Sequence, residues 1–176
     1  MAVGFMKVPT ADMTASHQSQ AEATVALADL DPADQRLLTA ARDVRARAYA
    51  PYSGFAVGAA VVTRSGAIHT GVNVENASYG LTVCAEVTAL AQAVGAGDFD
   101  VLAIAVVGGP VEANGQTGTP TTPCGRCRQV IQEAAGVSGA DIRVLCADAG
   151  LTGILVTSIA RLLPHAFGPH DPGGPG

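Results

Sequence analysis

Two short cysteine motifs, forty residues apart, constrain the fold of this chain more than any other feature. The first is Cys84-Ala85-Glu86 and the second is Pro123-Cys124-Gly125-Arg126-Cys127. Three thiolates are a ligand set that zinc favours, and one ion bound by both motifs would bring the two segments together. A structural zinc site usually has four protein ligands, whereas a catalytic site has three and leaves one position open. The motifs therefore predict a catalytic Zn²⁺ site with Cys84, Cys124 and Cys127 as its ligands.

A carboxylate beside the first cysteine offers the acid–base group that such a site needs. Glu86 lies two residues after Cys84, and the two side chains cannot easily bind the same ion from one helical turn. We therefore expect Glu86 to take a proton from a water molecule that the metal activates and to pass it to the substrate. The alternative is a closed structural site with an exposed Glu86, in which His165 or His170 is the fourth ligand.

The positions of the cysteines also favour their thiolate forms. The sequence predicts that Cys84 and Cys124 lie at the first turns of two helices, where free N–H groups and the helix dipole stabilise negative charge. Three thiolates on one divalent ion nevertheless leave one negative charge in excess. Arg126 or Arg128, on either side of Cys127, is expected to offset part of that charge.

Apolar periodicity divides the chain into alternating strands and helices. Asp31 and Pro32 are typical of a helix start, and Arg64-Ser65-Gly66 predicts a turn between two strands. The alternation predicts an α/β fold in which a mixed sheet lies between layers of helices. We expect helices over residues 31–50, 84–96 and 156–163 and from 123 onward, strands over 55–63, 71–74, 101–107 and 142–146, and a loop over 108–122.

Composition narrows the classes of function. The net charge is −5 and the basic residues form no cluster, which argues against binding to nucleic acid. Charged residues make up only 14% of the chain, and a weakly charged surface favours an oligomer. We find no apolar stretch of membrane-spanning length and no secretory signal core, so we expect a cytoplasmic protein with no membrane partner. Cys146 is then expected to be a buried apolar residue, with two disulfides as the alternative.

The two ends of the chain differ in character from its middle. Residues 1–30 are rich in Ala, Thr, Ser and Gln without a sustained apolar period, which predicts a flexible extension. Residues 31–168 are predicted to form one zinc-dependent domain. Residues 169–176 contain mainly Pro and Gly and are predicted to be a disordered tail.

Several segments besides the cysteine motifs complete a recognisable pattern. Together with those motifs, they resemble the cytidine deaminases of the small homotetrameric type. The resemblance runs from about Leu37 to Phe167, roughly three quarters of the chain. The segments that carry it are Tyr52-Ser53-Gly54-Phe55-Ala56-Val57-Gly58-Ala59-Ala60, Asn73-Val74-Glu75-Asn76-Ala77-Ser78-Tyr79, Pro123 to Gln129, and Leu163 to Gly168.

The resemblance implies a specific fold and reaction. It implies a three-layer α-β-α sandwich around a mixed sheet of about five strands. It also implies that residues 31–168 are a zinc-dependent deaminase domain. Such a domain hydrolyses cytidine and deoxycytidine to uridine and deoxyuridine in pyrimidine salvage, and it is a homotetramer with active sites shared between subunits.

The resemblance also implies roles for substrate-binding residues. Asn73 and Glu75 would hydrogen-bond the ribose 3′-hydroxyl, and Phe55 and Phe167 would pack against the base or sugar, Phe167 in a neighbouring subunit's site. Ala85, inside the first motif, belongs to the same set. On residue type alone, Phe55 would be a core aromatic and Asn73 and Glu75 would be turn residues.

One position departs from the family's pattern. The residue after the acid–base glutamate is commonly Arg in the family, and here it is Val87. Related deaminases that act on the antibiotic blasticidin S also have an aliphatic residue there. Deamination of such a modified cytosine nucleoside is therefore an alternative function, and a non-catalytic zinc-binding module is an alternative of a different class.

Overall fold

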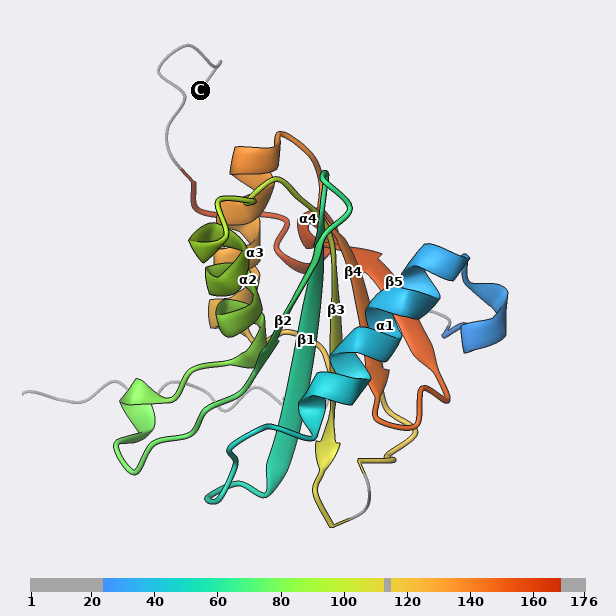
Figure 1. Cartoon of the computed structure of the whole chain (residues 1–176), viewed down its shortest axis with the longest axis vertical. Coiled ribbons are helices and arrows are strands. Elements are labelled where there is room, and N and C mark those ends of the chain that lie inside the picture. Colours follow the sequence, from blue (N-terminus) through green and yellow to red (C-terminus); the bar gives the residue numbers. More distant parts are fainter. Residues whose placement is uncertain (1–23, 113–114, 169–176) are drawn as a thin grey trace, which may run out of the picture.

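A five-stranded mixed sheet separates one long helix from two others (Figure 1). The computed structural model describes residues 24–112 and 115–168. Three elements are short: the 3-10 helices η1 (Leu27–Asp29) and η2 (Tyr79–Leu81) and the helix α4 (Ile159–Leu162). The others are α1 (Pro32–Arg45), β1 (Phe55–Thr63), β2 (Ile68–Val72), α2 (Ala85–Gly95), β3 (Val101–Pro110), α3 (Gly125–Ser138), β4 (Arg143–Asp148) and β5 (Ile154–Ser158).

The strand order is β2-β1-β3-β4-β5. Among the strands of residues 24–112 and 115–168, the β3–β4 pair is the one parallel pair, and α3 is the crossover helix that joins these two strands. The β1–β2, β1–β3 and β4–β5 pairs are antiparallel. The predicted turn at residues 64–66 joins β1 to β2, with Gly66 at a φ of 87°. The mixed five-stranded sheet is confirmed.

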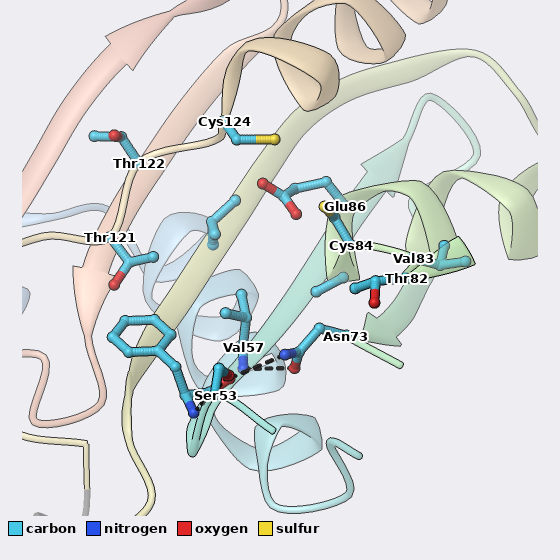
Figure 2. Close-up of a pocket in the computed structure, with 13 residues that line it drawn as sticks. Ser53, Val57, Asn73, Thr82, Val83, Cys84, Glu86, Thr121, Thr122 and Cys124 are labelled. Carbon is cyan, nitrogen blue, oxygen red and sulfur yellow. Dashed lines mark hydrogen bonds between the residues drawn. The ribbon is translucent and has the colours of Figure 1, made fainter. Parts of the chain in front are cut away.

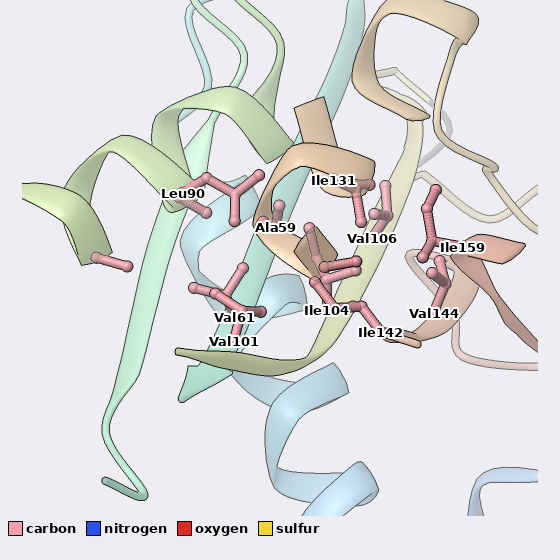
Figure 3. Close-up of a cluster of buried hydrophobic side chains, with 14 of the residues drawn as sticks. Ala59, Val61, Leu90, Val101, Ile104, Val106, Ile131, Ile142, Val144 and Ile159 are labelled. Carbon is pink, nitrogen blue, oxygen red and sulfur yellow. The ribbon is translucent and has the colours of Figure 1, made fainter. Parts of the chain in front are cut away.

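Side chains that alternate along the strands build a separate hydrophobic core on each face of the sheet. Ala59, Ile104 and Val144 face one side, where they pack with residues of α2 and α3 (Figure 3). Ala60 and Leu145 face the other side and pack with α1. The molecule therefore has the predicted three layers, with α1 on one face and α2 and α3 on the other.

The first long helix begins as the sequence predicts and ends earlier. The Asp31 side chain accepts hydrogen bonds from the backbone N–H groups of Ala33 and Asp34, both at 2.9 Å. The helix ends at Arg45, so the predicted end near residue 50 is wrong. The reason is tertiary: beyond the helix, Tyr49 N donates to Asn73 O at 3.1 Å, which draws this segment to the sheet.

The predicted final helix over residues 156–163 is also wrong in its first half. Residues 154–158 form β5, which pairs with β4, and only the short α4 follows it. A short apolar run does not distinguish a strand from a helix by periodicity. Ile154, Val156 and Thr157 are β-branched and favour a strand at the edge of the sheet.

Other strand boundaries also differ from the predicted ones, and β4 lies over residues 143–148 and not over 142–146. β3 continues to Pro110 and not only to 107, because Gly108 and Gly109 pair with residues of β1. A Cβ on Gly109 would lie 2.2 Å from the carbonyl oxygen of Gly115, so this glycine permits the close approach of another segment. β2 lies over residues 68–72 and not over 71–74.

Residues 24–30, which the sequence assigned to an extension, contact the domain. Val25 N donates to Ile154 O at 2.9 Å and Ile154 N donates to Val25 O at 3.0 Å. The predictions for residues 1–23 and 169–176 concern residues outside the described ranges. Within the described ranges, none of the helices has both the length and the apolar character that crossing a bilayer requires.

Candidate metal centre and active site

Three cysteine sulfur atoms converge where α2 and α3 begin. Cys84 is the N-cap residue of α2 and Cys124 is the N-cap residue of α3, and neither side chain caps its own helix. Cys127 lies in the first turn of α3 and is buried. The three Sγ atoms all lie within 4.8 Å of one another, and Cys124 Sγ donates to Cys127 Sγ at 3.6 Å. The predicted ligands therefore come together.

The chemistry and spacing of this group fit zinc. Tetrahedral zinc with Zn–S bonds of about 2.3 Å places its sulfur ligands roughly 3.8 Å apart. This is the one group of three or more His, Cys, Asp or Glu side chains that could hold a metal within residues 24–112 and 115–168. His165 is not part of the group, and His170 lies outside the described residues. The donor set is that of a site with three protein ligands.

The thiols form a hydrogen-bonded cluster that readily loses its first proton. The hydrogen bond from Cys127 lowers the pKa of Cys84 to about 6, against the opposing effects of burial and of the Glu86 carboxylate. Cys124 and the positive charge of Arg126 lower it further. The pKa of Cys127 is raised, because in the same cluster it donates to Cys84 and is buried. Of Cys84 and Cys127, Cys84 is therefore the thiol that ionises first.

Glu86 lies next to the sulfur atoms in a nearly closed environment. Its side chain leaves the first turn of α2 and is only 4% exposed. Burial raises the pKa of its carboxyl group, and hydrogen bonds from its own backbone N–H and from Cys127 oppose this effect. In Figure 2 the carboxylate points toward the sulfur of Cys124. A buried carboxyl group with a raised pKa holds a transferred proton better than an exposed one does.

A cavity of about 220 Å³ opens in front of this group. Its walls come from the start of β1, the segment that leads into α2 and the loop before α3 (Figure 2). The lining residues are Ser53, Phe55, Val57, Asn73, Thr82, Val83, Cys84, Ala85, Glu86, Val106, Thr121, Thr122 and Cys124.

Comparison with known proteins identifies the family. A sequence profile of the cytidine and deoxycytidylate deaminase zinc-binding region matches residues 31–139. The cytidine deaminase of Halalkalibacterium halodurans is 45% identical over 138 residues, which are 78% of this chain and 96% of that protein. The chain belongs to the cytidine and deoxycytidylate deaminase family. The resemblance predicted from the sequence is thereby confirmed.

Solved structures of cytidine deaminases share the fold of this family member. The crystal structure from Burkholderia pseudomallei superposes with a TM-score of 0.65 at 47% identity, covering 75% of this chain and 97% of that one. The structure from Mycobacterium tuberculosis has a TM-score of 0.60 at 39% identity and covers 80% and 99% of the two chains. The predicted fold class is confirmed, and the family's zinc-binding region agrees with zinc as the cofactor.

Of the substrate residues expected from the family, Phe55, Asn73 and Ala85 line the cavity. The Asn73 side chain is buried and already engaged: its Oδ1 accepts from Val57 N at 2.8 Å and its Nδ2 donates to Phe55 O at 2.9 Å. These bonds fix the start of β1, and they leave one amide N–H and one lone pair for a ligand. Asn73 therefore stabilises the start of β1, in addition to its predicted role in binding the ribose.

Glu75 lies outside this cavity and lines an adjoining hollow of about 380 Å³, which shares Ser53 and Thr82 with it. Its carboxylate accepts from Ser53 Oγ at 2.5 Å and from the N–H groups of Tyr52 and Ser53. The Ser53 hydroxyl keeps the pKa of Glu75 below its usual value; desolvation opposes this effect and the two N–H donors add to it. Glu75 is therefore an anion in the hollow next to the cavity.

Phe167 is not brought to the cavity of its own chain. Its side chain is 83% exposed, and its carbonyl oxygen accepts from Gln129 Nε2 of α3 at 2.7 Å. It borders a hollow on the outer surface of α3 together with Gln132, Glu133 and Val137. Within one subunit, Phe167 has no contact with the proposed site.

The sequence interpretation assigned no role to several residues of the cavity wall. These are Ser53, Val57, Thr82, Val83, Val106, Thr121 and Thr122. Thr82 and Val83 precede Cys84, and Thr121 and Thr122 precede Pro123, so nearness to the cysteine motifs was an available signal. Val106 is placed there only by the pairing of β3 with its neighbours, which residue spacing does not reveal.

The loop that carries two of these threonines is anchored by a buried carboxylate. Asp148, at the end of β4, is 0% exposed. Its Oδ2 accepts from the N–H groups of Thr117 and Gly118, and its Oδ1 accepts from Thr152. Burial acts to raise its pKa, but the hydrogen bonds from Gly118, Thr117 and Thr152 outweigh this effect and the pKa is lowered. Asp148 thus holds the segment that leads to Cys124.

Proposed function

We propose that this chain hydrolyses cytidine and deoxycytidine to uridine and deoxyuridine in pyrimidine salvage. The observation that carries the proposal is the buried Glu86 carboxylate beside three converging thiols, in a member of a deaminase family. A non-catalytic zinc module has no use for a buried acid of this kind, because burying a carboxyl group costs free energy.

Cys84, Cys124 and Cys127 would hold the zinc ion, which supplies Lewis-acid activation of a water molecule. Glu86 takes the proton that this water loses, and its raised pKa lets it hold that proton. The oxygen of that water would bond to ring carbon C4, and Glu86 would pass its proton to ring N3. Glu86 would then move the proton of the new C4 hydroxyl group to the amino group, so that the C4–N bond breaks, ammonia leaves and the C4 carbonyl of uridine forms. The remaining cavity residues orient the substrate and exclude bulk water.

The shape of the site supports a placement for the nucleoside. The cavity of about 220 Å³ receives the pyrimidine ring between Phe55 and Ala85. The ribose then lies toward the hollow of about 380 Å³, where Asn73 has one amide N–H left and the Glu75 carboxylate accepts from the 3′-hydroxyl.

The subunit-shared site remains part of the proposal. Tyr49, Tyr52, Tyr79 and Leu81 are each more than half exposed, and such apolar groups favour burial between subunits. Phe167, which is also exposed, is free to enter the site of a neighbouring copy in a homotetramer. Sedimentation at assay concentration tests this arrangement, and a monomeric active enzyme would contradict it. The predicted cytoplasmic location stays a prediction.

Gly108→Ala is expected to raise the KM for cytidine about tenfold, with a smaller effect on kcat. The added Cβ would lie 2.8 Å from Cγ2 and Oγ1 of Thr121 and 3.1 Å from Cε1 of Phe55. Both side chains would move into the cavity, at a cost of about 1.4 kcal/mol in binding. Steady-state kinetics give both constants.

The matched control for this glycine is Gly95→Ala at the end of α2, where an added Cβ meets no atom within 4 Å. It should leave KM unchanged. Equal KM values in Gly108→Ala and the wild type would contradict the prediction. They would show that the extra methyl group is accommodated without narrowing the cavity.

The function itself is tested by offering three substrates to purified, zinc-loaded protein. Cytidine, deoxycytidine and blasticidin S are assayed separately by ammonia release, and zinc is measured per chain. Turnover of the first two supports the proposal. Turnover of blasticidin S alone would favour the alternative that Val87 suggests, and a zinc-loaded chain inert to all three would favour the non-catalytic module.

A further inference from the structure

The proposed metal centre carries more negative charge than its ion can balance. Three thiolates exceed the charge of Zn²⁺ by one, and the ionised form of Glu86 adds another. Cys127 is 0% exposed and Glu86 is 4% exposed, so water screens the charge of these two groups poorly. A cation near the ligands would stabilise the loaded site.

Two arginines flank Cys127, and the structure distinguishes them. Arg128 is directed at backbone oxygens: its Nε donates to Pro123 O at 2.9 Å and its Nη1 donates to Leu162 O at 3.1 Å. This side chain holds the entry of α3 against the end of α4. Its hydrogen bonds therefore serve the packing of α3.

Arg126 instead reaches across to the other ligand-bearing segment. Its Nη1 donates to Thr82 O at 3.4 Å, two residues before Cys84, while its own backbone lies between Cys124 and Cys127. None of the ion pairs among residues 24–112 and 115–168 involves Arg126. Its positive charge is therefore not cancelled by a neighbouring carboxylate, and its position between Cys124 and Cys127 keeps that charge beside the ligand-bearing segments.

We propose that Arg126 is a positioning residue of the metal centre, which ties the segment before Cys84 to α3 and offsets the excess negative charge of the thiolates. This inference rests on the proposed zinc-dependent function. It assigns Arg126 a role in holding the ion and not in the chemical step. Val87, beside Glu86 in α2, offers no positive charge. We therefore assign the offsetting charge to Arg126 in α3.

The test measures zinc affinity directly and does not depend on turnover. Zinc-loaded wild type and Arg126→Gln are titrated with a chromogenic chelator, which reports the zinc dissociation constant at equilibrium and the rate of zinc release. Removing a group that supports metal ligands typically costs 10- to 100-fold in affinity, so we expect Arg126→Gln to bind zinc roughly 10- to 100-fold more weakly. Arg126→Lys, which keeps the charge, should lie closer to the wild type.

The control is Arg36→Gln, an exposed arginine of α1 on the opposite face of the sheet, which should leave zinc affinity unchanged. Circular dichroism of each zinc-free variant checks that the fold is intact. Equal zinc affinities in Arg126→Gln and the wild type would overturn the inference. A wild type that holds zinc but deaminates nothing would refute the proposed function alone, whereas a wild type that holds no zinc would refute both.

Discussion

Replacing Glu86 with glutamine is expected to lower kcat for cytidine by roughly 10²- to 10⁴-fold, the usual contribution of a positioned acid–base group. Glutamine has nearly the same volume and fits the buried site, but it cannot take a proton from water. Because Glu86 is not among the three converging sulfur ligands, zinc should stay bound. The measurements are kcat and the zinc content of each protein.

The matched control is Glu112→Gln, the same change at an exposed residue after β3, which should keep full activity. The result depends on both measurements together. A Glu86→Gln protein that retained its zinc and turned over cytidine at the wild-type rate would exclude Glu86 as the proton carrier. Loss of zinc along with activity would instead assign Glu86 a role in metal binding.

Asp148→Ala is expected to cost about 3 kcal/mol in the free energy of unfolding at pH 7. The substitution removes a buried acceptor and leaves the N–H groups of Thr117, Gly118 and Thr152 without it. Hydrogen bonds to a charged group contribute about 1.5–3 kcal/mol each, part of which water recovers at the loop. For a chain of this size, the loss corresponds to a drop of roughly 6–12 °C in melting temperature.

The effect of Asp148 should also depend on pH, with a definite sign. Its pKa is lowered in the folded protein, so its contribution is present above the unfolded pKa of about 3.9 and is lost as pH falls through the folded value. Wild type and Asp148→Ala should therefore converge in stability in strong acid. Asp43→Ala, at an exposed carboxylate of α1, should change the free energy of unfolding by less than about 0.5 kcal/mol both at pH 7 and in strong acid. A constant gap between wild type and Asp148→Ala at all pH values would contradict the assignment.

The metal centre was predictable because its signal is local. Cys84 and Cys124 are recognisable from their neighbours, and each begins a helix for reasons that lie within a few residues. Both helices pack on one face of the sheet, and their first residues lie close enough there for the sulfur atoms to converge. The buried strands β1, β3 and β4 were predictable for a similar reason, since their apolar runs are continuous.

The errors came from contacts between distant residues. Nothing near Val156 shows that β4 will pair with its segment, and nothing near Tyr49 shows that Asn73 will draw the chain away from α1. The position of Glu75 is a similar case, because its bonds to Tyr52 and Ser53 depend on how β1 and β2 align. The sequence motifs alone could not show that Asn73 and Glu75 line two different hollows.

The double engagement of Asn73 limits how the specificity of this enzyme could be redesigned. Its amide secures the backbone of Phe55 and Val57, so any replacement aimed at a new sugar would also loosen a central strand. Thr121 and Thr122 line the same space, and the backbone N–H of Thr121 donates to Ala147 O at 3.3 Å, a bond that a change of side chain would keep. A library that varies these two threonines and keeps Asn73 would test new nucleosides while it leaves the hydrogen bonds that fix β1 in place.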